Sequence, residues 1–179
     1  WIWGYKETDI LGGDDPYSAS KAATELLIHS YIKSFFTDNN NMIRISSARA
    51  GNVIGGGDWS TNRIIPDCFK SWKKNKPVKI RNFYSTRPWQ FVLEPLYGYL
   101  KLGYYLNSSK NYHGQSFNFG PDNNSEQTVL KLLNEIKIHY PKATWVPIDK
   151  KLLKESTLLK LNCEKSYKLL NWKCVLSFK

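Results

Sequence analysis

Apolar side chains recur at helical spacing along several stretches of the chain. From Tyr17 to about Phe36, the apolar stripe consists of Ala22, Ala23, Leu26, Leu27, Tyr31 and Phe35. This period predicts a helix whose stripe is buried. The same spacing predicts helices from Pro66 through Trp72, over 95–106, over 127–140 and over 163–170.

Short apolar runs between turn residues predict the strands. MIRISSA (42–48) indicates a buried strand, and further strands are expected at 78–81, 91–93, 116–120 and 144–148. Strands therefore alternate with helices, and this order is typical of the α/β class with a parallel sheet.

The composition and the ends of the sequence add to this picture. Hydrophobic residues make up 41% and aromatic residues 15%, which is typical of a globular chain. No apolar run approaches the ~20 residues that span a bilayer, and no signal-peptide pattern is present, so we expect a cytoplasmic protein without a membrane partner. The sequence starts at Trp1 and its only methionine is Met42. We therefore expect a fragment of a longer protein.

The net charge is +11, from 26 basic and 15 acidic residues. Such a field attracts anions, including nucleic acids and phosphorylated small molecules. The basic residues are scattered and form no DNA-binding motif, which favours a basic surface over a nucleic-acid site. The three cysteines and three histidines have no ligand spacing, so neither a metal site nor a disulfide framework is expected.

Tyr17 and Lys21 lie four residues apart in PYSASKAATE and therefore share one helix face. A lysine ammonium beside a phenol favours the phenolate, which can accept a proton from a sugar hydroxyl. The same lysine is placed to donate a hydrogen bond to a cofactor ribose. By spacing alone, such a pair is more often an exposed aromatic beside an exposed lysine.

Two loops lie where ligands bind in open α/β sheets. The first, Arg49 to Trp59, contains three consecutive glycines that allow a close backbone approach to a ligand. The second, Ser85 to Trp89, carries Arg87, whose planar guanidinium suits a diphosphate. Arg63 is a second candidate for a phosphate contact. The alternatives are a plain turn, an arginine stacked on Trp89, and a solvated Arg63.

Several motifs, taken in order, resemble the extended short-chain dehydrogenase/reductase family and, within it, the CDP-glucose 4,6-dehydratases. These motifs are PYSASK, RAGNVIGGGDW, RIIPDCFKSW, RPWQFVLEPLYGYL and FNFGP. The resemblance implies a Rossmann-like parallel sheet, of which only the later strands are present, and a small α/β substrate-binding part. Residues 1–60 would be the later part of the NAD-binding domain. Residues 61–179 would mainly bind the sugar nucleotide, with returns to the Rossmann sheet.

The resemblance also implies a reaction and roles for single residues. The reaction is the NAD-mediated internal redox dehydration of CDP-glucose to CDP-4-keto-6-deoxy-glucose, as in polysaccharide precursor synthesis. Tyr17 and Lys21 would be catalytic and would also contact NAD. The remaining implied contacts are Ala50, Gly51 and Val53 for the cofactor, and Asn52, Arg63, Arg81 and Arg87 for the substrate.

The family's dinucleotide turn and its elimination acid and base would precede Trp1. The resemblance therefore implies that these 179 residues alone are inactive. It also implies a homodimer for the full-length protein, in which Leu26, Leu27, Tyr31 and Phe35 could serve either the dimer contact or the core. Three alternatives stay open at this point: a sugar-nucleotide epimerase or reductase, a non-enzymatic basic binding module, and a remnant that no longer folds.

Overall fold

The computed structural model describes residues 3–38, 41–121, 127–148 and 159–178. Its helices are α1 (Pro16–Phe35), α2 (Ile64–Trp72), α3 (Leu93–Ser108), α4 (Val129–His139), α5 (Glu164–Leu170) and the 3-10 turn η1 (Lys110–Tyr112). Its strands are β1 (Ser47–Ala50), β2 (Val53–Ile54), β3 (Val78–Ile80), β4 (Thr86–Arg87), β5 (Gln90–Phe91), β6 (Ser116–Phe119), β7 (Gln127–Thr128) and β8 (Trp145–Pro147). The predicted α/β class is confirmed.

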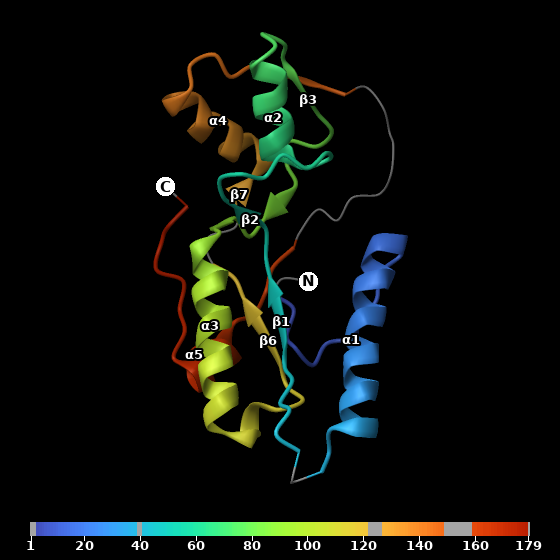
Figure 1. Ribbon diagram of the computed structural model, residues 1–179. Helices are drawn as coiled ribbons and strands as arrows, with labels where there is room; N and C mark the ends of the chain where they lie inside the picture. Colours follow the sequence, from blue (N-terminus) through green and yellow to red (C-terminus); the bar gives the residue numbers. More distant parts are fainter. Residues whose placement is uncertain (1–2, 39–40, 122–126, 149–158, 179) are drawn as a thin grey trace.

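The strands form pairs that are mostly parallel. β1 pairs with β6, β2 with β5, and β3 with β8 in parallel, whereas β4 and β7 are antiparallel. Each parallel pair joins segments separated by at least one helix in sequence, as expected for crossover connections. Figure 1 shows β1 and β6 in the lower part of the molecule and β3 in the upper part.

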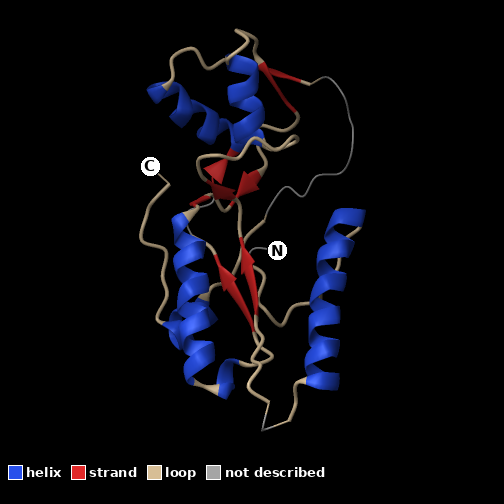
Figure 2. Cartoon of the chain, in the orientation of Figure 1, coloured by secondary structure: helices blue, strands red, loops and turns tan. Residues whose placement is uncertain are grey.

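Two groups of buried side chains hold the chain together. The first, called the lower core, lies among α3, β6 and α5 and consists of Leu102, Phe117, Phe119, Leu170 and Trp172. The second, called the upper core, lies among α2, β3 and α4 and contains Cys68, Trp72, Val78, Ile80, Trp89, Val129, Leu132, Leu133 and Ala143. The helices and strands that carry the two cores form the lower and upper parts of the molecule in Figure 2, and short strands lie between these parts.

Helix α1 begins at a well-formed cap. The Asp15 carboxylate accepts a hydrogen bond from the Ser18 backbone N–H at 3.0 Å, and Pro16 occupies the first turn. The predicted helix is confirmed, but its apolar stripe is not buried within this chain. Leu26, Leu27, Tyr31 and Phe35 are each more than half exposed, because no other described element packs over this face. Helical spacing reveals an apolar face but does not supply its partner.

The predicted strand at 42–48 is wrong for residues 42–46. Met42 is 85% exposed, and the backbone of this stretch makes no strand ladder. The Ile45 N–H instead donates to His113 Nδ1 at 3.0 Å, and the Ile45 carbonyl accepts from the Gly114 N–H. This segment is therefore held by the turn before β6, and strand pairing starts only at Ser47.

The segment after α5 runs back along α3 toward the upper core (Figure 1). The buried Glu94 side chain fixes it, because Glu94 Oε1 accepts the N–H groups of Val175 and Leu176 at 3.1 and 2.7 Å. Phe178 then packs against the upper core. Among the described helices, none is long and apolar enough to cross a membrane.

Candidate active site

One large cavity, of about 1020 Å³, opens between α1, the loops after β1 and β2, and the upper core. Segments from distant parts of the chain line it, and they include β3, the stretch from Asn82 to Trp89 and the start of α4. Parallel crossovers bring these segments to one place, as expected where ligands bind in α/β folds.

Most of the residues that the sequence analysis assigned to a site line this cavity. They are Tyr17, Ala50, Gly51, Asn52, Val53, Arg63, Arg81 and Arg87. Lys21 is the exception, because it does not form part of the cavity wall. The three glycines of the loop after β2, Gly55, Gly56 and Gly57, also line it.

Tyr17 and Lys21 lie on the exposed side of the first turns of α1. Tyr17 is 71% exposed, and Lys21 Nζ lies 5.8 Å from the centroid of the Tyr17 ring. The Lys21 ammonium makes no hydrogen bond or ion pair within the described stretches. With respect to the part of the chain that the structure describes, the pair therefore offers an unbonded phenol at the cavity and an unbonded ammonium beside it.

The turn between β1 and β2 is held by hydrogen bonds and brings backbone to the cavity wall. A Cβ on Gly51 would lie only 3.0 Å from Pro88 Cγ and 3.1 Å from the Pro88 carbonyl oxygen. The Asn52 carbonyl accepts from the Gln90 N–H at 2.9 Å, and the Gly51 N–H donates to the Phe119 carbonyl. These bonds tie the turn to β5 and β6, so the Asn52 side chain starts from a fixed backbone.

The loop from Gly55 to Arg63 forms a wall of the cavity and leaves open space beside its glycines Gly56 and Gly57. Gly57 has φ +83°, a left-handed conformation that favours glycine, and its Cβ position is open space. The Asp58 carboxylate accepts from the Ser60 N–H and lies 3.6 Å from Arg63 Nε. Hydrogen bonds from Ser60 and the positive charges of Arg63 and Lys70 lower the pKa of Asp58 below its ordinary value.

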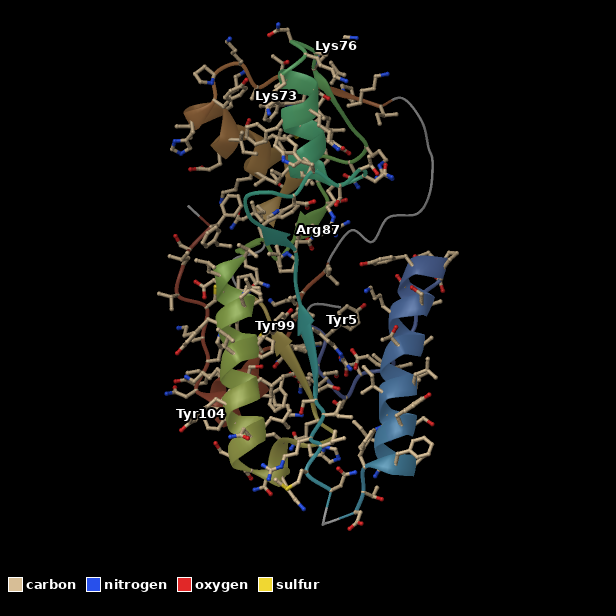
Figure 3. The ribbon with its side chains drawn as sticks, in the orientation of Figure 1. Tyr5, Lys73, Lys76, Arg87, Tyr99 and Tyr104 are labelled. Carbon is tan, nitrogen blue, oxygen red and sulfur yellow. The ribbon has the colours of Figure 1, made fainter. Side chains whose placement is uncertain are left out.

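Positive charge dominates the cavity lining. Among the described residues of the lining, four are cations (Arg63, Lys79, Arg81 and Arg87) and two are carboxylates, Asp58 and Asp67. Arg87 lies on β4, in the strand pair β4–β7 between the two cores (Figure 3). Its Nη1 donates a hydrogen bond to the Thr86 carbonyl at 2.8 Å. Guanidinium groups held in this way suit phosphate oxygens. The arrangement can therefore bind a phosphorylated ligand and present its hydroxyl groups to the Tyr17 phenol.

Two lining residues, Trp59 and Asp67, received no role in the sequence analysis. Both lie inside the motifs RAGNVIGGGDW and RIIPDCFKSW. The position of Trp59 after a glycine-rich turn is a sequence cue, but its exposure and the free carboxylate of Asp67 become visible only in the structure. Among the described residues, no group of three His, Cys, Asp or Glu side chains is placed to hold a metal ion.

Comparison with known proteins gives a consistent result. No protein-family model matches the chain. A CDP-glucose 4,6-dehydratase from Salmonella typhimurium is 40% identical over 176 residues, which cover 96% of this chain and 49% of the relative. The chain thus spans about half the length of the curated relative that it matches.

Solved structures match the fold at lower sequence identity. A dTDP-glucose 4,6-dehydratase from Bacillus anthracis in complex with NAD has a TM-score of 0.75 at 19% identity, covering 98% of this chain and 52% of its own. A dTDP-glucose 4,6-dehydratase from Streptomyces venezuelae, also with NAD bound, has a TM-score of 0.78 at 17% identity (98% and 51% covered).

An epimerase matches equally well. The UDP-glucuronic acid 4-epimerase from Bacillus cereus, in complex with UDP-glucuronic acid and NAD, has a TM-score of 0.76 at 21% identity, covering 96% of this chain and 53% of its own. By sequence the chain is therefore similar to a CDP-glucose 4,6-dehydratase over about half of that protein's length, and its fold matches that of solved dehydratase and epimerase structures.

Proposed function

We propose that this chain is the tyrosine–lysine and substrate-binding part of an NAD-dependent CDP-glucose 4,6-dehydratase. The observation that carries the proposal is the cavity, which joins the Tyr17 phenol on α1 to Arg63, Arg81 and Arg87 from distant segments. A dehydratase acting on a sugar nucleotide needs cations that bind the diphosphate and a proton acceptor near the sugar, and the lining of the cavity offers these groups. The 40% identity to a CDP-glucose 4,6-dehydratase supports the choice of reaction and of nucleotide.

The residues present fit the nicotinamide end of NAD. Tyr17 and Lys21 are both exposed on one face of α1, and the Lys21 ammonium is free to donate to ribose hydroxyls. The backbone of Ala50, Gly51 and Val53 would form the facing wall. NAD, when bound, supplies reversible hydride transfer at the sugar. In this proposal the later Rossmann strands and the substrate part divide near residue 60.

The residues of this chain would act on the substrate in a defined order. Arg87 would bind the diphosphate, with Arg63 and Arg81 adding positive charge near phosphate or base. Asn52 would hold the substrate beside the diphosphate. Tyr17 would then accept the proton of the sugar 4-hydroxyl, and the Lys21 ammonium would stabilise the phenolate that does so.

The catalytic test uses the longest open reading frame that contains this chain, since the chain covers about half of its relative. We expect the purified protein to convert CDP-glucose, with catalytic NAD, to a 4-keto sugar whose carbon 6 is a methyl group in NMR spectra. A product inverted at carbon 4 that keeps its hydroxymethyl group would identify an epimerase instead. No product, together with retention on heparin that falls steeply with salt, would support the basic binding module.

Two matched variants test the role of Tyr17. Tyr17→Phe removes only the hydroxyl and should reduce kcat about 100-fold or more, while CDP binding is unchanged. Tyr31→Phe changes another exposed tyrosine of α1, away from the cavity, and serves as the control. Equal activity of the two variants would refute the assignment of Tyr17.

A further inference from the structure

Asp67 is an unusual residue in this cavity, because it places a carboxylate among arginines and lysines. It lies in the first turn of α2 and is half-buried. The other lining carboxylate, Asp58, is engaged by Ser60 and Arg63. The Asp67 carboxylate, by contrast, makes no hydrogen bond or ion pair with any residue that the structure describes. It is therefore available as a hydrogen-bond acceptor.

A free carboxylate repels the phosphate groups of an anionic ligand. The part of the ligand that lies beside Asp67 is therefore expected to carry hydrogen-bond donors. In a cytidine nucleotide, the exocyclic amine of the base is such a donor. Carboxylates accept hydrogen bonds from this amine, whereas the corresponding group of uracil or thymine is a carbonyl, which is an acceptor. A carboxylate therefore attracts the cytosine edge and repels the uracil edge.

Trp59 offers a stacking surface in the same cavity. It is 52% exposed, and two lysines at the end of α2 contact it. Lys73 Nζ lies 4.5 Å from the centroid of its ring, and Lys70 Nζ donates to its carbonyl oxygen. Lys70 follows Asp67 by three residues, so both lie on one side of α2. Trp59 and Asp67 thus border the same side of that helix.

We infer that Trp59 and Asp67 form the nucleobase subsite of the cavity and select cytosine over uracil. Trp59 stacks on the pyrimidine ring, and the Asp67 carboxylate accepts a hydrogen bond from the exocyclic amine. This inference rests on the proposed function, because it supplies the base recognition that a CDP-sugar requires.

The test is calorimetric titration of the 179-residue chain with CDP, UDP and inorganic pyrophosphate. We expect the wild-type chain to prefer CDP over UDP about tenfold or more. Asp67→Asn should bring the CDP:UDP ratio close to one, since an amide can also donate to the uracil carbonyl. Trp59→Ala should weaken CDP and UDP alike by about 5- to 150-fold and leave pyrophosphate binding unchanged.

Glu135→Gln is the matched control, because it removes a carboxylate on α4 that does not line the cavity. It should leave all three affinities unchanged. An unchanged CDP:UDP ratio in Asp67→Asn would overturn the inference while CDP and pyrophosphate binding still supported the proposed function. If the folded wild-type chain bound neither CDP nor pyrophosphate, both proposals would be wrong. Trp59→Ala keeps the test decisive even if Asp67→Asn unfolds α2.

Discussion

Arg49 on β1 holds Glu25 on α1 in a two-pronged ion pair. Arg49 Nη2 donates to Glu25 Oε2 at 2.6 Å, and Arg49 Nε donates to Oε1. The hydroxyl of Ser47 also donates to this carboxylate. Because the apolar face of α1 is exposed, this polar cluster is a main attachment of α1 to β1 and β6. It therefore helps to place Tyr17 at the cavity.

Breaking this ion pair should loosen α1. Glu25→Gln should lower the free energy of unfolding by about 1–3 kcal/mol, because the Arg49 guanidinium, whose side chain is 20% exposed, loses its counter-charge. Urea unfolding followed by circular dichroism measures the change. Glu164→Gln is the control, since its pair with Lys168 spans 3.8 Å between side chains that are 65% and 69% exposed. It should change stability by less than about 0.5 kcal/mol.

The same carboxylate predicts how stability depends on pH. Burial raises the pKa of Glu25, but hydrogen bonds and charge from Arg49, with hydrogen bonds from Ser47 and Ser116, outweigh it and hold the pKa below its ordinary 4.5. The folded state therefore binds the proton more weakly than the unfolded state. The contribution of Glu25 to stability is complete above about pH 4.5 and is lost as the pH falls through the lowered value.

Unfolding measured from pH 7 down to pH 3 tests this dependence. In Glu25→Gln, the part of the acid destabilisation that belongs to this group should disappear. Parallel curves for the wild-type chain and the variant would contradict the assignment.

Two glycines of α3 should respond oppositely to alanine. A Cβ on Gly98 would lie 2.4 Å from Phe119 Cδ1 and 3.0 Å from Trp172 Nε1, inside the lower core. Gly98→Ala should therefore destabilise the fold by about 1–3 kcal/mol through overpacking. A Cβ on the exposed Gly103 meets nothing within 4 Å, so Gly103→Ala should stabilise the same helix by about 1 kcal/mol. Thermal unfolding distinguishes the two, and equal shifts would refute this packing of α3.

Cys68 should be the least reactive of the three thiols. Burial in the upper core, helped by the neighbouring negative charge of Asp67, raises the pKa of Cys68 to about 12. The reactive thiolate is therefore nearly absent at neutral pH. Mass spectrometry after brief alkylation of the folded chain should find Cys163 and Cys174 modified first, and denaturant should abolish the difference. Early modification of Cys68 would show that the upper core opens easily.

The sequence predicted the helices better than the strands. The spacing of apolar residues identified α3 and α4 to within a few residues, because amphipathic helices carry a local signal. Residues 42–46 misled the prediction, since an apolar run does not reveal whether a neighbouring strand is available. The apolar stripe of α1 is exposed within this chain for a similar reason: burial depends on a partner that local periodicity does not contain.

The candidate site was predictable in its parts but not in its assembly. Tyr17 and Arg87 stood out by residue type and spacing, yet their meeting in one cavity depends on parallel crossovers between distant segments. Trp59 and Asp67 lacked a role because a stacking surface or a free acceptor is defined by its surroundings. Their roles, like those of Tyr17 and Lys21, stay predictions until the variants are measured.

The parallel pairing of β1 with β6 has a kinetic consequence. Ser47 and Ser116, which pair across these strands, are 69 residues apart in sequence. The lower core is built on this pair, so a large loop must close before its contacts form. High contact order of this kind is associated with folding in milliseconds to seconds rather than microseconds. During that interval the apolar side chains of β6 are accessible to other molecules, and the yield of native protein depends on how fast the loop closes.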